Sequence, residues 1–239
     1  MLEAFESGLT VDYVIARVDE IDPQLEPLCE KFGVDLYSLY ADTYDKLADA
    51  HTPQPALAVV HAPSLAIDER FEASPSSFLV LVDVSDPGNV GTLIRTAEAA
   101  GCAGVIVTSE TADVLSPKVV RSSAGSVLRV PVGEVSVDEL PGVLAGLGAF
   151  SLATAMDGVP YSEVDIPADQ SLAIILGSEA HGLDAELLSS ASATVSIPMH
   201  GKVESLNVAT AGAVLAFSCL LYTSPSPRDA TLSRMPSSA

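Results

Sequence analysis

The sequence predicts an α/β protein with a mainly parallel sheet, preceded by a smaller α/β unit. From residue 78 onward, short apolar runs alternate with segments of helical periodicity, which is typical of parallel sheets. Most of these runs are apolar throughout, as expected for strands whose two faces are both covered by helices. A polar stretch that contains prolines comes before this region. We therefore expect two domains, residues 1–62 and 78–222, joined by a linker at 63–77.

The first domain is predicted to alternate strands and helices. Its helices are expected at Asp22–Phe32, with Pro23 in the first turn, and at Tyr40–Leu47. Apolar runs predict its strands at Val11–Ala16, Leu36–Leu39 and Ala56–Val60. A domain of this kind is a small α/β unit with its own sheet.

The second domain is predicted to hold six strands and five helices. The strands are expected at Phe78–Val82, Val105–Val107, Val130–Val132, Leu152–Ala155, Leu172–Leu176 and Thr194–Ile197. The helices are expected at Val90–Ala100, Pro117–Ser123, Val137–Gly146, Ala185–Ser190 and Ser205–Leu220. Residues 223–239 follow neither period and contain three prolines, so we expect a disordered tail. Its sequence also resembles translated adaptor sequence, which predicts a non-native tail with no role in function.

Composition narrows the class of protein. Hydrophobic residues make up 48% of the 239, which is enough for a sizeable core. No apolar run approaches the ~20 residues that span a bilayer, and the first residues do not resemble a signal peptide. The cysteines Cys29, Cys102 and Cys219 fit neither a disulfide framework nor a C-x-x-C metal site. We expect a cytoplasmic protein with no metal and no membrane contact.

The net charge of −21 disfavours broad contact with nucleic acid. Residues 1–72 carry 15 acidic and 4 basic side chains, and residues 73–222 carry 16 and 5, so neither domain is basic. Three cations nevertheless lie close together in the sequence, at Lys118, Arg121 and Arg129. They are the predicted contacts for phosphate, although a lone arginine such as Arg121 often forms a structural ion pair instead.

Three polar segments follow predicted strands. Asp83-Val-Ser-Asp-Pro-Gly-Asn89 leads into a helix that carries Arg95. Leu176-Gly-Ser-Glu-Ala-His-Gly-Leu183 follows the fifth predicted strand, and Ser196-Ile-Pro-Met-His-Gly-Lys-Val-Glu-Ser-Leu-Asn-Val-Ala209 follows the sixth. Ligands of open α/β sheets bind at the carboxyl ends of strands, so these segments predict a binding site. From spacing alone, Asn89 could equally be a helix N-cap, Arg95 a solvated residue and Ser205 an ordinary cap.

Other chemistries lack their motifs. The sequence has no G-x-G-x-x-G after a strand, no G-x-x-x-x-G-K-[ST] and no G-x-S-x-G. A dinucleotide site, a P-loop and a hydrolase elbow are therefore not supported. Glu179 and His181 have no partners at the spacing of zinc ligands, so we expect no zinc site, and His181 is interpreted as structural.

The three segments, in this order and each at a strand end, resemble the SpoU (TrmH-like) family of RNA ribose 2′-O-methyltransferases in the SPOUT superfamily. The resemblance covers nearly the whole chain. It implies a parallel-sheet SPOUT domain with a C-terminal trefoil knot. It also implies a homodimer that takes its methyl group from S-adenosylmethionine. The first domain resembles the ribosomal-protein-L30e-like domain that precedes the catalytic domain in many members, with its basic opening helix and first strand missing.

The resemblance also implies roles for individual residues. The catalytic candidates are Asn89, Arg95, Glu179, Ser205 and Asn207. The cofactor-binding candidates are Thr154, Gly177, Ile197, Met199 and Leu206, with Thr154–Gly158 as a further cofactor loop. Arg95 is often proposed as the base in this family, but a guanidinium, which does not give up its proton in proteins, is better suited to orient the ribose and stabilise its oxyanion.

The implied substrate is structured RNA, and the L30e-like domain favours 23S ribosomal RNA. Three alternatives stay open: a tRNA substrate, a catalytically silent SpoU-fold protein that only binds RNA, and an unrelated small-molecule α/β enzyme. The missing N-terminal elements and the acidic charge favour the silent protein, whereas the intact catalytic candidates disfavour it.

Overall fold

The computed structural model of the protein describes residues 2–48, 53–71, 75–201, 203 and 205–223. The chain divides between Pro63 and Ser64 into two compact units, each with a hydrophobic core of its own. The predicted tail lies outside the described residues except for Thr223.

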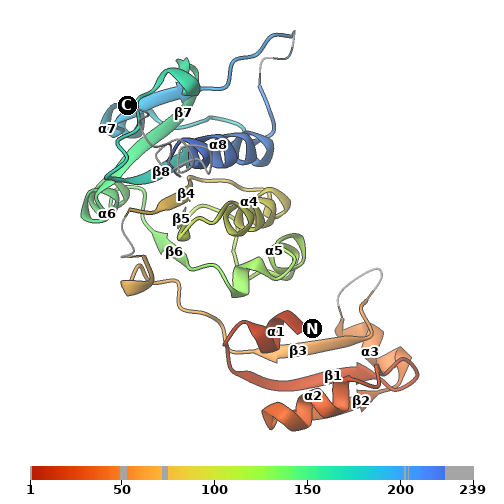
Figure 1. Ribbon diagram of the computed structural model, residues 1–239. Coiled ribbons are helices and arrows are strands. Elements are labelled where there is room, and N and C mark those ends of the chain that lie inside the picture. Colours follow the sequence, from red (N-terminus) through yellow and green to blue (C-terminus); the bar gives the residue numbers. More distant parts are fainter. Residues whose placement is uncertain (1, 49–52, 72–74, 202, 204, 224–239) are drawn as a thin grey trace, which may run out of the picture. The chain divides into compact units, whose positions relative to one another are not determined.

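The first unit contains a three-stranded sheet in the order β2-β1-β3 (Figure 1). Its elements are α1 (Leu2–Glu6), β1 (Val11–Arg17), α2 (Leu25–Phe32), β2 (Asp35–Leu39), α3 (Ala41–Leu47) and β3 (Ala56–Val60). β1 is parallel to β2 and antiparallel to β3. The helix expected from Asp22 begins only at Leu25, because Asp22 accepts the N–H of Gln24 and closes a turn that includes Pro23.

The second unit contains a six-stranded parallel sheet in the order β6-β5-β4-β8-β7-β9. Its strands are β4 (Ser77–Leu81), β5 (Gly104–Thr108), β6 (Val132–Val135), β7 (Ala149–Pro160), β8 (Ser171–Leu176) and β9 (Ala193–Ser196). Its α-helices are α4 (Pro87–Ala100), α5 (Pro117–Ser122), α6 (Leu140–Gly146), α7 (Ala185–Ser190) and α8 (Val208–Thr223). Three 3₁₀ turns, η1 (Glu69–Phe71), η2 (Ser126–Leu128) and η3 (Tyr161–Glu163), complete the list.

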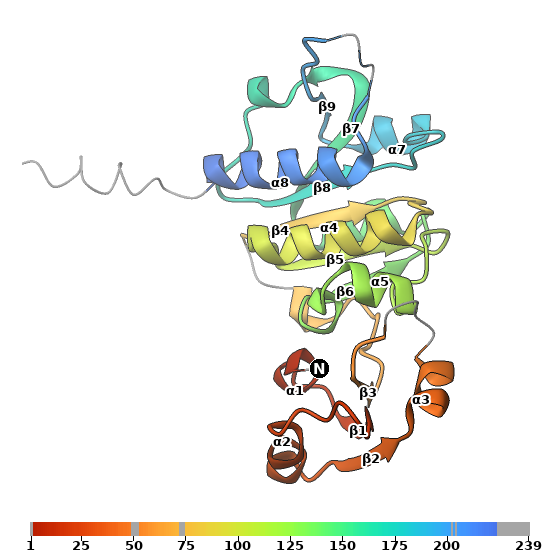
Figure 2. The ribbon, with the colours of Figure 1, turned by 90° about the vertical axis from the view of Figure 1, so that its right-hand side faces the viewer.

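Helices cover both faces of this sheet, which explains why its strands are apolar throughout. Leu79 and Leu81 of β4 pack in one core with Leu93 of α4, whereas Phe78 and Val80 pack in a second core on the opposite face. α4 and α8 lie side by side over the first face (Figure 2). The contact is close, because a Cβ on Gly212 of α8 would lie 2.3 Å from Leu93.

Two strands differ from their predicted bounds by more than one residue at an end. The strand expected at Val130–Val132 begins only at Val132, because the N–H of Val130 bonds Ser126 in a turn and Pro131 has no N–H to donate. The strand expected to end at Ala155 continues to Pro160. Residues 154–158, predicted as a cofactor loop, therefore lie inside β7, where the pairing with β9 breaks register between Thr154 and Val159.

Three helices of the second unit also begin elsewhere than predicted. α4 begins at Pro87 rather than Val90, and α8 at Val208 rather than Ser205, because capping side chains precede them. α6 begins at Leu140 rather than Val137, since Glu139 accepts bonds from the N–H and hydroxyl of Ser136 and holds a turn there.

The first part of the expected linker packs on the second unit. The carbonyl of Leu65 accepts the backbone N–H of Glu134 in β6. Phe71 is buried in the core that includes Phe78. Among the described residues, no helix is both long enough and apolar enough to cross a bilayer.

Candidate functional site

The site lies at the carboxyl ends of neighbouring strands of the second unit. β4 and β8 are adjacent, and the N–H of Val82 bonds the carbonyl of Leu176 at 2.9 Å where both strands end. The segment after β4 carries Asn89, and the segment after β8 carries Glu179. The segment after β9 leads to Asn207 and α8, which packs on α4. The fold thus brings all three predicted segments together.

The N-cap of α4 is Asp86, not Asn89. Asp86 Oδ1 accepts the backbone N–H of Asn89 at 2.9 Å. That bond lowers the pKa of Asp86, and Lys118, 3.6 Å from the other carboxylate oxygen, acts in the same direction. Because the backbone of Asn89 is capped by a neighbour, its side chain is left for other contacts. Asp86 was not among the predicted site residues, although its D-P-G-N context is a helix-start signal.

Three of the predicted catalytic side chains form one hydrogen-bonded group. Asn89 Nδ2 donates to Glu179 Oε1 at 2.5 Å, and Asn207 Nδ2 donates to Asn89 Oδ1 at 3.0 Å. Asn207 Oδ1 in turn accepts the N–H groups of Ala209 and Thr210 at 3.0 and 3.3 Å. Asn207 is therefore the cap of α8, a position that spacing alone assigned to Ser205. Ser205 and Leu206 precede the helix and are exposed.

Arg95 lies apart from this group. It is exposed on α4, and its side chain forms no ion pair or hydrogen bond with the residues that the structure describes. It comes six residues after Asn89, which is roughly 9 Å along the helix axis. A guanidinium without a protein partner keeps all its donors for a ligand.

The turn between β4 and α4 is held by a threonine that the sequence reading missed. Asp83 adopts the left-handed region with φ 55°, which is costly for a residue that is not glycine. Thr108 Oγ1, at the end of β5, accepts the N–H of Asp83 at 2.9 Å and donates to Asp83 Oδ1 at 2.7 Å. These two bonds hold the bend that directs the chain toward Asp86 and Asn89. Positive φ is not visible in a sequence, so nothing distinguished Thr108 beforehand.

Of the five cofactor candidates, Thr154 lies inside β7 and the other four lie in the segments after β8 and β9. Gly177 meets the backbone of Gly182 so closely that a Cβ would lie 2.5 Å from its carbonyl carbon. Thr154 donates its hydroxyl to the carbonyl of Ile175 at 2.9 Å, which ties β7 to β8. Ile197 is half-buried, and Met199 and Leu206 expose 38% and 37% of their surface, so apolar groups are available there for a ligand.

The three predicted RNA-binding cations have different surroundings. Arg129 forms a two-pronged ion pair with Glu98, at 2.6 and 2.9 Å, which lowers the pKa of that carboxyl. The stabilisation from this pair is present at neutral pH and is lost as the pH falls through the lowered pKa of Glu98. Lys118 has only the loose contact to Asp86, and Arg121 is exposed and unpaired among the described residues.

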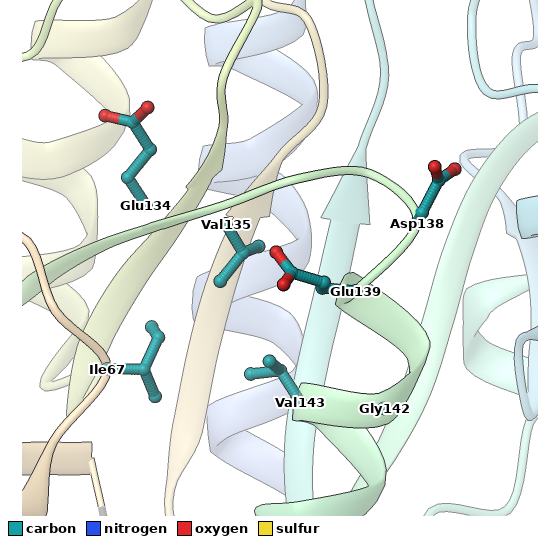
Figure 3. A pocket seen from close by; sticks show the side chains of 7 residues that line it. All are labelled: Ile67, Glu134, Val135, Asp138, Glu139, Gly142 and Val143. Carbon is teal, nitrogen blue, oxygen red and sulfur yellow. The ribbon is translucent and has the colours of Figure 1, made fainter.

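One hollow on the second unit does not belong to this site. It lies beside α6 and is lined by Glu134, Asp138 and Glu139 with apolar neighbours (Figure 3). It contains none of the predicted site residues. Within the described part of the chain, no cluster of three or more His, Cys, Asp or Glu side chains could hold a metal ion.

The sequence and the fold match one family. The model of the SpoU rRNA Methylase family matches residues 76–217, which include the whole hydrogen-bonded group. The chain belongs to the SpoU family. A Bacillus subtilis relative named 23S rRNA (guanosine(2553)-2'-O)-methyltransferase RlmP is 36% identical over 90% of this chain and 83% of its own.

Solved structures of family members have the same fold. An AdoMet-bound rRNA methyltransferase from Sinorhizobium meliloti superimposes with a TM-score of 0.82 and 26% identity, over 94% of this chain and 85% of that one. The SpoU methyltransferase AviRb from Streptomyces viridochromogenes gives 0.83 and 26%, over 93% and 86%. The predicted SPOUT fold is confirmed by these likenesses.

Proposed function

We propose that this SpoU protein transfers a methyl group from S-adenosylmethionine to a ribose 2′-hydroxyl of structured RNA, with 23S ribosomal RNA as the substrate. The observation that carries the proposal is the Asn89–Glu179–Asn207 group, together with the unpaired side chain of Arg95 six residues further along α4. Its family members include proteins named as 23S rRNA 2′-O-methyltransferases. No motif for another reaction class accompanies these residues.

The chemistry accounts for a guanidinium at this place. A ribose 2′-hydroxyl is a poor nucleophile until its proton leaves, and the developing oxyanion needs a nearby cation. Arg95 can orient the ribose and its phosphate through several donors and can stabilise that charge. The cofactor supplies an electrophilic methyl on a sulfonium, and this step requires no metal ion.

The strand-end loops fit S-adenosylmethionine. Gly177 brings two backbone segments together without a side chain, and the N–H and C=O groups of such a turn can contact a ligand. Ile197, Met199 and Leu206 supply apolar surface for the adenine. The hydroxyl of Thr154 already donates to the carbonyl of Ile175, so Thr154 forms part of the wall of the cofactor site. We assign the cofactor to these five residues, with Ser205 at the reacting side.

We also propose a trefoil knot and a homodimer in the cytoplasm. β9 is at the sheet edge beyond β7, yet the chain returns from it to lay α8 across β8 and α4, and such a return supports a knot. On α8, Phe217 exposes 48% of its surface and Ala213 and Val214 are only half-buried, which favours a partner on that side. In such a dimer, Arg95 of one subunit would complete the cofactor site of the other.

Substitution of Phe217 by glutamate should separate the subunits and lower methyl transfer at least 10-fold. Because Phe217 is exposed within one chain, the separated subunit should stay folded, with a thermal midpoint lowered only by the loss of the dimer contact. Light scattering and the transfer rate would be measured together. Leu215→Glu is the contrasting variant: Leu215 is 1% exposed and packs in the core, so a charge there should unfold the second unit. A Phe217→Glu monomer with the full wild-type rate would refute the shared site.

RNA affinity should depend on Lys118 and Arg121 but not on Arg129. Neutralising the first two together should weaken binding and reduce the salt dependence by roughly 1.5 in the log–log slope. Arg129→Ala should instead lower stability, because it leaves Glu98 without its partner. Titrations of RNA at several salt concentrations would compare the variants, and an unchanged slope for the double variant would place the RNA elsewhere. We propose the first unit, as an L30e-like domain, for the remaining RNA contacts.

The function is tested by incubating the protein with labelled S-adenosylmethionine and ribosomal RNA. We expect label in 23S RNA. The alternative, a silent protein that only binds RNA, predicts RNA binding without label. Label that enters tRNA alone would correct the substrate but keep the reaction.

A further inference from the structure

We propose that Glu179 is a positioning residue that acts through Asn89 and Asn207, and that the site requires a hydrogen-bond donor to face an acceptor at each contact between these three side chains. The inference rests on the proposed function and deepens it. It assigns to Glu179 no contact with the methyl group or the ribose oxygen. Its contribution is to orient two amides that join three strand-end segments.

The orientation of these hydrogen bonds is fixed at Asn207. Asn207 Oδ1 accepts the backbone N–H groups of Ala209 and Thr210, so only its Nδ2 can face Asn89. Asn89 must then present Oδ1 to Asn207 and Nδ2 to Glu179. A flipped Asn89 amide would place an oxygen against the carboxylate and a donor against a donor. Every bond therefore donates in the direction of Glu179.

Glu179 suits the end of such a chain because a carboxylate only accepts hydrogen bonds. Bonds to a charged acceptor are stronger than neutral ones, so Glu179 holds the Asn89 amide in one orientation. The three residues come from α4, from the segment after β8 and from the cap of α8. Loss of these hydrogen bonds would let the three segments move relative to one another. Two of the segments carry the cofactor candidates Gly177 and Leu206.

The role predicts different results for two substitutions of one residue. Glu179→Gln keeps an acceptor oxygen for Asn89 Nδ2, so the rate of methyl transfer should fall less than 10-fold. Glu179→Ala removes the acceptor, and the rate should fall at least 100-fold. If Glu179 worked by its charge or its proton, glutamine would be as damaging as alanine.

A paired exchange tests this matching of donor and acceptor, because it reverses the bond between residues 89 and 179. Asn89→Asp replaces the Nδ2 donor by oxygen and sets two carboxylates against each other, so it should be as damaging as Glu179→Ala. Adding Glu179→Gln supplies a donor from the other side, while the introduced aspartate still accepts from Asn207. The double variant should therefore recover at least 10-fold over Asn89→Asp in kcat and in cofactor affinity. If either substitution merely damaged the fold, the two together would lower activity further and would not restore it.

The measurements separate this inference from the function on which it rests. Methyl transfer and the cofactor affinity by calorimetry are measured for each variant, with Glu186→Gln as control, because it removes an equal exposed charge from α7. The side-chain amide of Asn207 is followed by nuclear magnetic resonance in the free protein. Its hydrogen exchange should quicken in Asn89→Asp, where repulsion between the two carboxylates pushes the aspartate away from Asn207, and slow again in the double variant.

Two outcomes would overturn the inference: Glu179→Gln as inactive as Glu179→Ala, or a double variant no better than Asn89→Asp. If the wild type transfers no methyl group, the proposed function fails. The hydrogen exchange of the Asn207 amide would then test the inference without any measurement of activity. An exchange rate that is equal in all variants would contradict the proposed hydrogen bonding.

Discussion

Replacing Arg95 by alanine should lower methyl transfer by about 10²–10³-fold while cofactor affinity stays within a few-fold. Arg95 is exposed on α4, whereas the cofactor candidates lie in β7 and in the segments after β8 and β9. Its side chain forms no hydrogen bond or ion pair with the described residues. Removing that side chain should therefore not disturb the Asn89–Glu179–Asn207 group. Its expected effect is confined to the step in which charge develops on the ribose oxygen.

Arg95→Lys is the matched variant. Lysine keeps the charge but not the planar set of donors, so the rate should be intermediate if orientation matters as well as charge. Transfer is measured with saturating cofactor, and calorimetry gives the affinity. Near-normal turnover of Arg95→Ala would contradict the role assigned to this residue.

Gly177→Ala should reduce the affinity for S-adenosylmethionine at least 10-fold. A Cβ at this position would lie 2.5 and 2.6 Å from the carbonyl carbon and oxygen of Gly182, and 2.8 Å from the N of Leu183. Because all three neighbours are backbone atoms, the turn must open to admit even a methyl group. Opening it would also break the bond from Gly182 N to Ser178 O that closes the turn at 2.8 Å.

Gly142→Ala is the control for this prediction. Gly142 is in α6, and a Cβ there meets nothing within 4 Å. Alanine favours a helix over glycine, so this variant should keep its affinity and gain slightly in stability. Calorimetry on both variants, with thermal unfolding as a check on folding, separates the turn from a general effect of alanine. Unchanged affinity in Gly177→Ala would remove this turn from the proposed cofactor site.

The order of strands and helices could be predicted from the sequence, because each buried strand is a continuous apolar run bounded by polar turns. The residues at which α4 and α8 begin could not be predicted. The start of each helix depends on which of several polar side chains accepts its free N–H groups. The caps are Asp86 and Asn207, whereas the sequence suggested Asn89 and Ser205.

The site was predicted as a set of residues, whereas its arrangement depends on the fold. Asn89 and Asn207 are 118 residues apart in the chain, and only the packing of α8 on α4 brings their amides into contact. Thr108 was missed because its role is to hold the positive φ of Asp83, which spacing does not reveal. Lys118, Arg121 and Arg129 look alike in sequence, but Arg129 is paired with Glu98 across 31 positions.

The position of the methyl group on the RNA tests the central claim most directly. Alkali cleaves RNA through attack by the ribose 2′-hydroxyl, so a methylated ribose leaves the bond that follows it intact. RNA labelled by this protein is hydrolysed completely in alkali, and the fragments are separated by size. The account predicts that the label is found in dinucleotides. Label in mononucleotides would mean methylation of a base, and would contradict the account.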